Sequence, residues 1–125
     1  MKKVFSLYRG KSEEIQRQRI GCHICAGLQG WIIGKEFYEP QDSNNISDDS
    51  IMAIRGAAIN KEFNVLMVYE YDNIGRDKYE TPFAVKWFID NNIDVVSVKY
   101  ENRDFDKEIN EILESIPESV KTYRG

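Results

Sequence analysis

A nearly unbroken apolar run from Phe63 to Tyr71 constrains this sequence more than any other feature. A strand with one face in water alternates apolar and polar residues, so this run predicts a strand that is covered on both faces. Such strands lie at the centre of parallel sheets that carry helices on both sides. Asp72 follows the run directly, and we therefore expect it at the carboxyl end of a central strand.

The remaining sequence alternates between strand and helix patterns around this run. Short blocks of apolar and β-branched residues predict three further strands, at 4–8, 31–38 and 93–100. Apolar residues at helical spacing predict helices at 12–29, 50–60, 79–91 and 105–116. The alternation predicts an α/β fold in three layers, with a mostly parallel sheet of four or five strands and helices on both faces.

The first helix is expected to begin at Ser12, whose hydroxyl can cap it, and acidic residues fill its first turn. Apolar or small residues recur along this helix and predict its buried side. They are Ile15, Ile20, Cys22, Ile24, Ala26 and Leu28.

Two later helices also have an apolar side. In the third helix, the side chains expected to point inward are Phe83, Ala84, Trp87 and Phe88. The last helix carries a stripe that Pro117 ends, formed by Phe105, Ile109, Ile112, Leu113 and Ile116. A chain of 125 residues with 42% hydrophobic residues fits one domain. We expect this domain at 1–116, followed at 117–125 by a tail or the start of a C-terminal extension.

The apolar runs are far too short to cross a bilayer, and the lysines after Met1 lead into no apolar signal segment. Cys22 and Cys25 lie too close together on a helix to close a useful disulfide loop, which fits a reducing compartment. We therefore expect a cytoplasmic protein with no membrane partner.

No metal or cofactor site is indicated. Cys22, His23 and Cys25 are grouped as in some zinc sites, but a structural zinc site needs about four ligands, and the sequence has no further Cys or His. We interpret the two cysteines as small packing residues and expect neither a metal nor a cofactor. The formal net charge of -4 gives no overall attraction to nucleic acid, so a DNA contact needs a local patch or a further segment.

Two segments lie where open α/β sheets hold ligands, after the carboxyl ends of strands. The segment 8–12 offers a hydroxyl, two cations and free backbone N–H groups to a phosphate, and the segment 72–76 follows the central strand. The letters Gly10-Lys11-Ser12 also end a nucleotide-binding phosphate loop. However, Phe5 stands in a strand where that loop requires its first glycine, so nucleotide binding is kept only as an alternative.

The segment Val68-Tyr69-Glu70-Tyr71-Asp72-Asn73-Ile74-Gly75-Arg76, followed by a helix and the strand 95–98, resembles a pattern of the serine recombinases. In that family a strand, an Asp-Arg-Leu-Gly-Arg motif, a helix and a strand follow one another. Tyr8 and Ser12 are similar to the family's tyrosine-x-arginine-valine-serine segment, and Gln18 lies where its first helix carries a glutamine. The resemblance covers about residues 3–100.

This resemblance implies a resolvase-like fold and a site-specific recombinase that cleaves and rejoins DNA. It implies Ser12 as the nucleophile that becomes joined to a 5′-phosphate, Arg76 as a phosphate-binding cation, and Asp72 as a residue that orients Arg76 or handles a proton. Together with Arg9 and Gln18 these are the candidate catalytic residues. The implied partners are DNA, bound with the help of a C-terminal region, and further copies of the chain in a dimer or tetramer.

The sequence departs from the family at Gly10 and Asn73, where arginines are expected, and no third arginine is found at 48–50. Arg9 lies one residue from the first of these positions, and strand alternation aims it at the opposite face unless a bulge intervenes. Loss of one charge-stabilising group commonly lowers a rate by about 10²–10³. The alternative to an active recombinase is therefore a non-catalytic interaction module of the same fold, which uses the stripe of its last helix to pair with itself or with a true recombinase.

Overall fold

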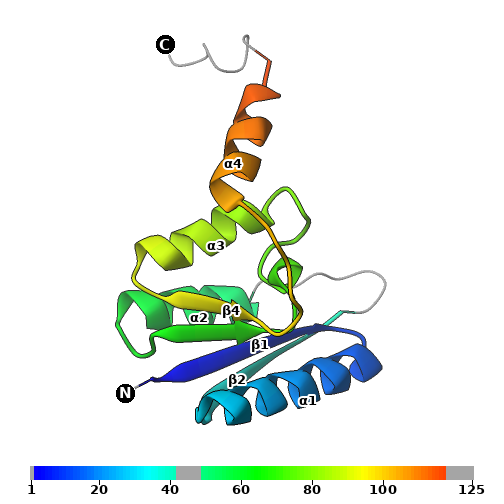
Figure 1. The fold of residues 1–125 in the computed structure, drawn as a ribbon, viewed down its shortest axis with the longest axis vertical. Coiled ribbons are helices and arrows are strands. Elements are labelled where there is room, and N and C mark those ends of the chain that lie inside the picture. The colour runs from blue at the N-terminus through cyan, green and yellow to red at the C-terminus, as the bar shows by residue number, and fades with distance from the viewer. Residues whose placement is uncertain (1, 42–48, 118–125) are drawn as a thin grey trace.

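The computed structural model describes residues 2–41 and 49–117 of the chain. Strands and helices alternate along these residues, and a short 3-10 helix, η1 (Tyr71–Asn73), follows the third strand (Figure 1). The strands are β1 (Val4–Gly10), β2 (Ile33–Pro40), β3 (Val65–Val68) and β4 (Asp94–Ser97). The α-helices are α1 (Ser12–Gln29), α2 (Asp49–Ile59), α3 (Thr81–Asp90) and α4 (Phe105–Glu114).

The strands form one parallel sheet in the order β2-β1-β3-β4. β3 pairs with β1 on one side and with β4 on the other, and all of its residues are buried. The predicted central strand is therefore confirmed, but its regular part is shorter than the apolar run. It ends at Val68, and the chain enters η1 at Tyr71, so Asp72 lies in that turn rather than directly after the strand.

Helices cover both faces of the sheet, which confirms the three predicted layers (Figure 1). α1 packs on one face, while α2 and α3 pack on the other. The core on the α1 side contains Val4, Tyr8, Ile15, Cys22, Ala26, Val65 and Met67. The core on the other side includes Leu7, Ile54, Leu66, Val68, Ala84 and Phe88. Successive residues of β1 and β3 thus enter opposite cores, as the alternation of side chains along a strand requires.

The apolar side predicted for α1 is only partly correct. Cys22 and Ala26 are buried, but Ile20, Ile24 and Leu28 are 57%, 60% and 82% exposed. Each residue of an α-helix advances by about 100°, so residues two positions apart lie about 200° apart around the axis. The row 20–24–28 is two positions out of phase with the buried residues and therefore faces outward.

α3 departs from the prediction at one aromatic residue. Ala84 and Phe88 are buried and Trp87 is partly buried, as predicted. Phe83 is 39% exposed, because Val85, about 200° away around the helix, occupies the inward position.

α4 projects from the body of the domain and contacts α3 (Figure 1). The side chain of Asp104 caps it by accepting a hydrogen bond from Lys107 N at 3.1 Å, and the Lys86–Asp106 ion pair at 3.4 Å links it to α3. None of the residues of α4 is fully buried, so its apolar stripe is only partly covered. Neither α4 nor any other helix in the described ranges is long and apolar enough to cross a membrane.

Two sequence predictions fall outside the described residues. The loop expected between the second strand and the second helix lies, from 42 to 48, outside the described ranges, and so does the tail from 118 to 125. The departure noted at 48–50 is described only at Asp49 and Ser50, where α2 begins.

Leu66→Ala is expected to lower the free energy of unfolding by about 2–5 kcal/mol, because Leu66 is fully buried on the central strand and its loss leaves a cavity. Leu28→Ala is the matched control, since it removes the same atoms from an exposed side chain and should change stability by at most about 0.5 kcal/mol. Urea denaturation followed by circular dichroism measures both. Equal losses would contradict the outward orientation of Leu28.

Candidate active site

Gln18 fixes the end of β1. β1 extends past β3, because the last residue of β3, Val68, pairs with Leu7. The carbonyl of Gly10 points towards the β2 side and accepts a hydrogen bond from a backbone N–H there at 3.0 Å. Successive residues of a strand direct their N–H and C=O groups to opposite sides, so those of Arg9 point to the other side, beyond the end of β3. There the Gln18 amide takes the place of a strand. Its Oε1 accepts from Arg9 N at 2.9 Å, and its Nε2 donates to Arg9 O at 2.8 Å.

The Arg9 side chain joins β1 to the loop after η1. It is only 6% exposed, and its Nη1 donates to Asn73 O at 3.2 Å and to Gly75 O at 3.1 Å. As strand alternation predicts, Arg9 lies on the face of Leu7, opposite to Tyr8. The irregularity in β1 is at the start of the strand, too far away to re-aim this side chain.

Gly10 lies where β1 turns towards α1. Its φ of 138° is a value that residues with a side chain rarely adopt, and a Cβ at this position would lie 2.9 Å from Oε2 of Glu14. The turn therefore suits glycine. An arginine here, as the recombinase pattern expects, would require a different backbone conformation.

Ser12 is the first residue of α1, and it is exposed. The helix cap is Lys11, and it forms no side-chain cap hydrogen bond, so the prediction that the Ser12 hydroxyl caps the helix is wrong. The turn at Gly10 shifts the extended capping position to Lys11, which leaves Ser12 inside the first turn. Its hydroxyl is thus close in sequence to backbone N–H groups that have no partner within a helix and that can bind a phosphate.

The loop 71–76 is packed tightly against α3 at Gly75. A Cβ on Gly75 would lie 2.7 Å from the backbone N of Thr81, so only glycine fits without displacing the chain. Asp72 and Arg76 on either side are exposed, and the residues between them are buried. Because this loop follows β3 and Ser12 follows β1, both lie at the carboxyl edge of the parallel sheet.

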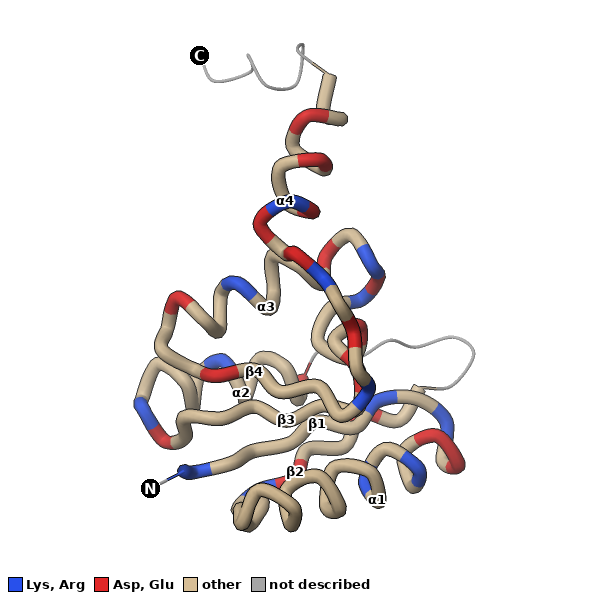
Figure 2. The backbone as a smooth tube through the Cα atoms, in the orientation of Figure 1, with Lys and Arg blue, Asp and Glu red and all other residues tan. Residues whose placement is uncertain are grey.

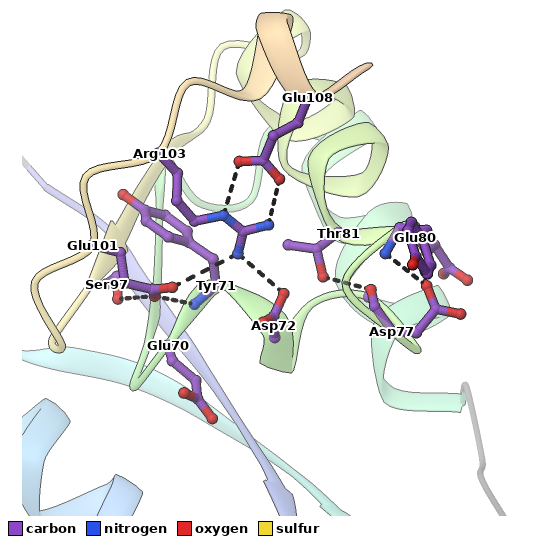
Figure 3. A network of polar contacts seen from close by, with 12 residues as sticks. Glu70, Tyr71, Asp72, Asp77, Glu80, Thr81, Ser97, Glu101, Arg103 and Glu108 are labelled. Carbon is purple, nitrogen blue, oxygen red and sulfur yellow. Dashed lines mark hydrogen bonds and ion pairs between the residues drawn. The ribbon is translucent and has the colours of Figure 1, made fainter. Parts of the chain in front are cut away.

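Asp72 binds an arginine that the sequence analysis did not identify. Its Oδ1 accepts from Nη1 of Arg103 at 3.1 Å, and the same guanidinium donates to Glu108 from Nε at 3.0 Å and from Nη2 at 2.7 Å (Figure 3). The carboxylate of Glu101 lies 3.7 Å from Nη1. The hydrogen bonds to Glu108 above all, and to Asp72, raise the pKa of Arg103 against the opposing effect of burial, so it remains charged.

A hollow of about 770 Å³ lies between this network and α4. Its lining includes Asp72, Lys78, Tyr79, Arg103, Glu108 and Ile112. The size suits a small molecule, but the carboxylates dominate the charge, and Arg103 is already bound to them. The hollow is therefore not suited to a DNA phosphate.

A second polar cluster connects α1 to β2 around Glu36. Tyr8 donates to Glu36 at 3.0 Å, Tyr38 at 2.7 Å and Arg19 at 3.3 Å, and His23 also binds this carboxylate. Partial burial is the largest single influence and raises the pKa of Glu36, but the four hydrogen bonds together lower it to about 2. Tyr8, part of the recombinase-like segment, thus faces this cluster rather than the exposed edge of the sheet.

The charge around the carboxyl edge is mixed. Figure 2 shows residues of both signs interspersed at this edge and along α4. The residues before Gly10 lie in β1, which includes Phe5, so the chain cannot wrap around a nucleotide phosphate there. The edge offers a few positioned cations rather than a broad electropositive surface.

The chain was compared with protein-family models, with curated proteins and with solved structures. A family model described as Resolvase, N terminal domain, matches residues 6–124. No curated protein matches the sequence significantly.

Solved structures share this fold. A resolvase family site-specific recombinase from Streptococcus pneumoniae matches with a TM-score of 0.75 at 12% identity, over 97% of this chain and 91% of that chain. The N-terminal catalytic domain of TP901-1 integrase matches with a TM-score of 0.67 at 24% identity, over 78% of each chain. The C-terminal catalytic domain of ISC1926 TnpA, an IS607-like serine recombinase, matches with a TM-score of 0.67 at 15% identity, over 89% of this chain and 78% of that chain. The predicted resolvase-like fold is therefore confirmed.

Gly75→Ala is expected to destabilise the protein by about 1–3 kcal/mol, because the added Cβ overlaps the backbone of Thr81. Gly56→Ala is the control, since a Cβ at Gly56 meets no atom within 4 Å and alanine favours the helix by about 1 kcal/mol. Thermal unfolding by differential scanning fluorimetry compares the two variants. An unchanged midpoint for Gly75→Ala would show that the loop does not depend on this close contact.

Glu36→Gln is expected to cost stability at neutral pH and progressively less as the pH falls. The folded pKa of about 2 lies below the unfolded value of about 4.3, so the contribution of Glu36 is complete above about pH 5 and is lost as the pH falls towards 2. Urea denaturation of both proteins between pH 7 and pH 2 measures this, with Glu62→Gln, exposed in the connection between α2 and β3, as the control. A difference that is independent of pH would rule out the ionised Glu36 as its source.

Proposed function

This chain belongs to the resolvase N-terminal domain family, whose members are recombinase catalytic domains that act on DNA and oligomerise, and we propose that it cleaves and rejoins DNA through the Ser12 hydroxyl. The observation that carries this assignment is the exposed position of Ser12 in the first turn of α1, where it makes no helix cap. A hydroxyl in this place can approach an external phosphate, and the N–H groups of the first turn favour the negative charge.

The proposed reaction consists of two phosphoryl transfers, one that cleaves the DNA strand and one that rejoins it. Oγ of Ser12 forms a bond to the phosphorus of a DNA phosphodiester, the bond from phosphorus to the 3′ oxygen breaks, and that oxygen takes up a proton in exchange for the one that Ser12 loses. Attack by a 3′ hydroxyl on the 5′-phosphoserine restores the phosphodiester and the serine. Because one phosphoester replaces another, no further co-reactant is needed.

Charge on the non-bridging oxygens during this transfer calls for positioned cations. We assign this role to Arg76, which is exposed at the same edge of the sheet, and to Lys11 beside Ser12. Arg9 is buried against the loop carbonyls, so we assign it to holding the loop that carries Arg76. Gln18 in turn holds the backbone of Arg9.

DNA and further copies of the chain are the proposed partners, in a dimer or tetramer that acts in the cytoplasm. Because the net charge of -4 gives no general attraction to DNA, DNA binding needs a local basic patch or a further segment, for which we propose a C-terminal region beyond the domain at 1–116.

Ser12→Ala is expected to abolish a covalent adduct between the protein and supercoiled DNA that carries candidate sites, after the reaction is stopped with denaturant. Arg76→Ala should lower the rate of adduct formation by about 10²–10³, because it removes one charge-stabilising group. Lys2→Ala, exposed before the start of β1 and so at the opposite, amino edge of the sheet, is the control and should leave the adduct unchanged. Gel electrophoresis with labelled DNA detects the product.

Either of two outcomes would overturn the assignment. An adduct that survives Ser12→Ala would place the nucleophile elsewhere. No adduct with any variant would favour the second candidate function, a non-catalytic interaction module. The partly covered stripe of α4 favours that alternative, because none of its apolar residues is fully buried within the domain.

A further inference from the structure

We infer that Arg103 is a positioning residue that couples the orientation of α4 to the placement of Asp72 at the candidate active site. Its guanidinium joins two segments that are far apart in sequence, with one hydrogen bond to Asp72 in η1 and two to Glu108 in α4 (Figure 3). The arginine side chain is only 17% exposed, and its fork binds Glu108 through two nitrogens, which fixes direction as well as distance. The role in catalysis rests on the proposed function, but the coupling does not.

Glu101 completes this connection from the other side. Its Oε2 accepts from the backbone N of Tyr71 at 3.0 Å and from Oγ of Ser97 at 3.2 Å, and its other oxygen faces Arg103. Three carboxylates, including Asp72, therefore converge on one cation. Without that cation they would repel one another, so the turn at η1 depends on Arg103 to keep this arrangement.

Aromatic side chains also connect the start of α4 to η1. Phe105, the first residue of α4, packs edge-on against Tyr71 with ring centroids 4.9 Å apart, and the Arg103 guanidinium lies 5.0 Å from the centroid of the Phe105 ring. Tyr71 directly precedes Asp72. The start of α4 is thus joined to η1 by a charged contact and by an apolar contact at once.

The rest of α4 is held much less firmly. None of its residues is fully buried, and among the described residues its other ion pair to the domain, Lys86–Asp106, leads to α3 instead of the sheet edge. The hollow of about 770 Å³ separates Ile112 on α4 from Tyr79 and gives the helix room to tilt. A tilt displaces Glu108, and Arg103 follows it, because two of its hydrogen bonds go to Glu108 and one to Asp72.

Hydrogen exchange of the amides at 70–76 tests this coupling in the free protein, without DNA. Glu108→Gln changes only α4, yet it should speed exchange at 70–76 by about three- to tenfold, as expected for a weakened charged hydrogen bond. Arg103→Gln should have at least the same effect, and Arg103→Lys should recover only part of it because it lacks the fork. Lys107→Gln, exposed on the same helix, is the matched control and should leave 70–76 unchanged.

The decisive comparison is the double variant. If the signal passes through Arg103, adding Glu108→Gln to Arg103→Gln causes no further change at 70–76. Additive effects, or exchange that rises equally in β3, would overturn the inference, since they indicate separate or global destabilisation. The adduct assay is then run on the same variants. Absence of adduct in every protein counts against the proposed function alone, whereas an unchanged exchange pattern counts against the coupling alone.

Discussion

The whole candidate site depends on the hydrogen bonds that the buried guanidinium of Arg9 donates to protein acceptors. A charged group inside a protein is tolerated only when it is hydrogen-bonded. Because β1 extends past β3, no strand lies beside Arg9 on that side, and the chain after η1 supplies the carbonyls of Asn73 and Gly75 instead. Gln18 satisfies the backbone of the same residue. One residue thus fixes α1 and the loop 71–76 relative to each other.

The glycines beside the site follow from this arrangement. The chain must change direction immediately after Arg9, and Gly10 does so at a φ of 138°, which places Ser12 in the first turn of α1 with its hydroxyl exposed. The loop must also approach α3 closely enough for its carbonyls to face Arg9, and Gly75 permits this by leaving no Cβ against Thr81. The backbone at position 10 therefore suits glycine and disfavours the arginine that the resemblance leads us to expect there.

Features set by local periodicity could be predicted from the sequence. The parallel sheet follows from alternating elements and an apolar central run, and the face on which Arg9 lies follows from strand alternation. Periodicity does not decide which side of α1 is buried, because the row 20–24–28 and the row 22–26 have the same spacing of four residues, and only the second packs against the sheet. Arg103 could not be predicted, because its partner Asp72 is 31 residues away and Arg103 itself lies in the irregular connection between β4 and α4, which no pattern marks.

The positive charges near the candidate site fall into two groups, one largely buried and one exposed. Arg9 and Arg103 are largely buried and bound to protein acceptors, so they can orient loops but cannot reach a phosphate without breaking the contacts that define the site. Lys11 and Arg76 are exposed at the edge of the sheet. The proposed mechanism therefore assigns the two largely buried arginines to maintaining the geometry of the site, and the two exposed cations to the substrate. Under the proposed mechanism, the absence of arginines at 10 and 73 lowers the rate while the fold around Arg9 stays intact.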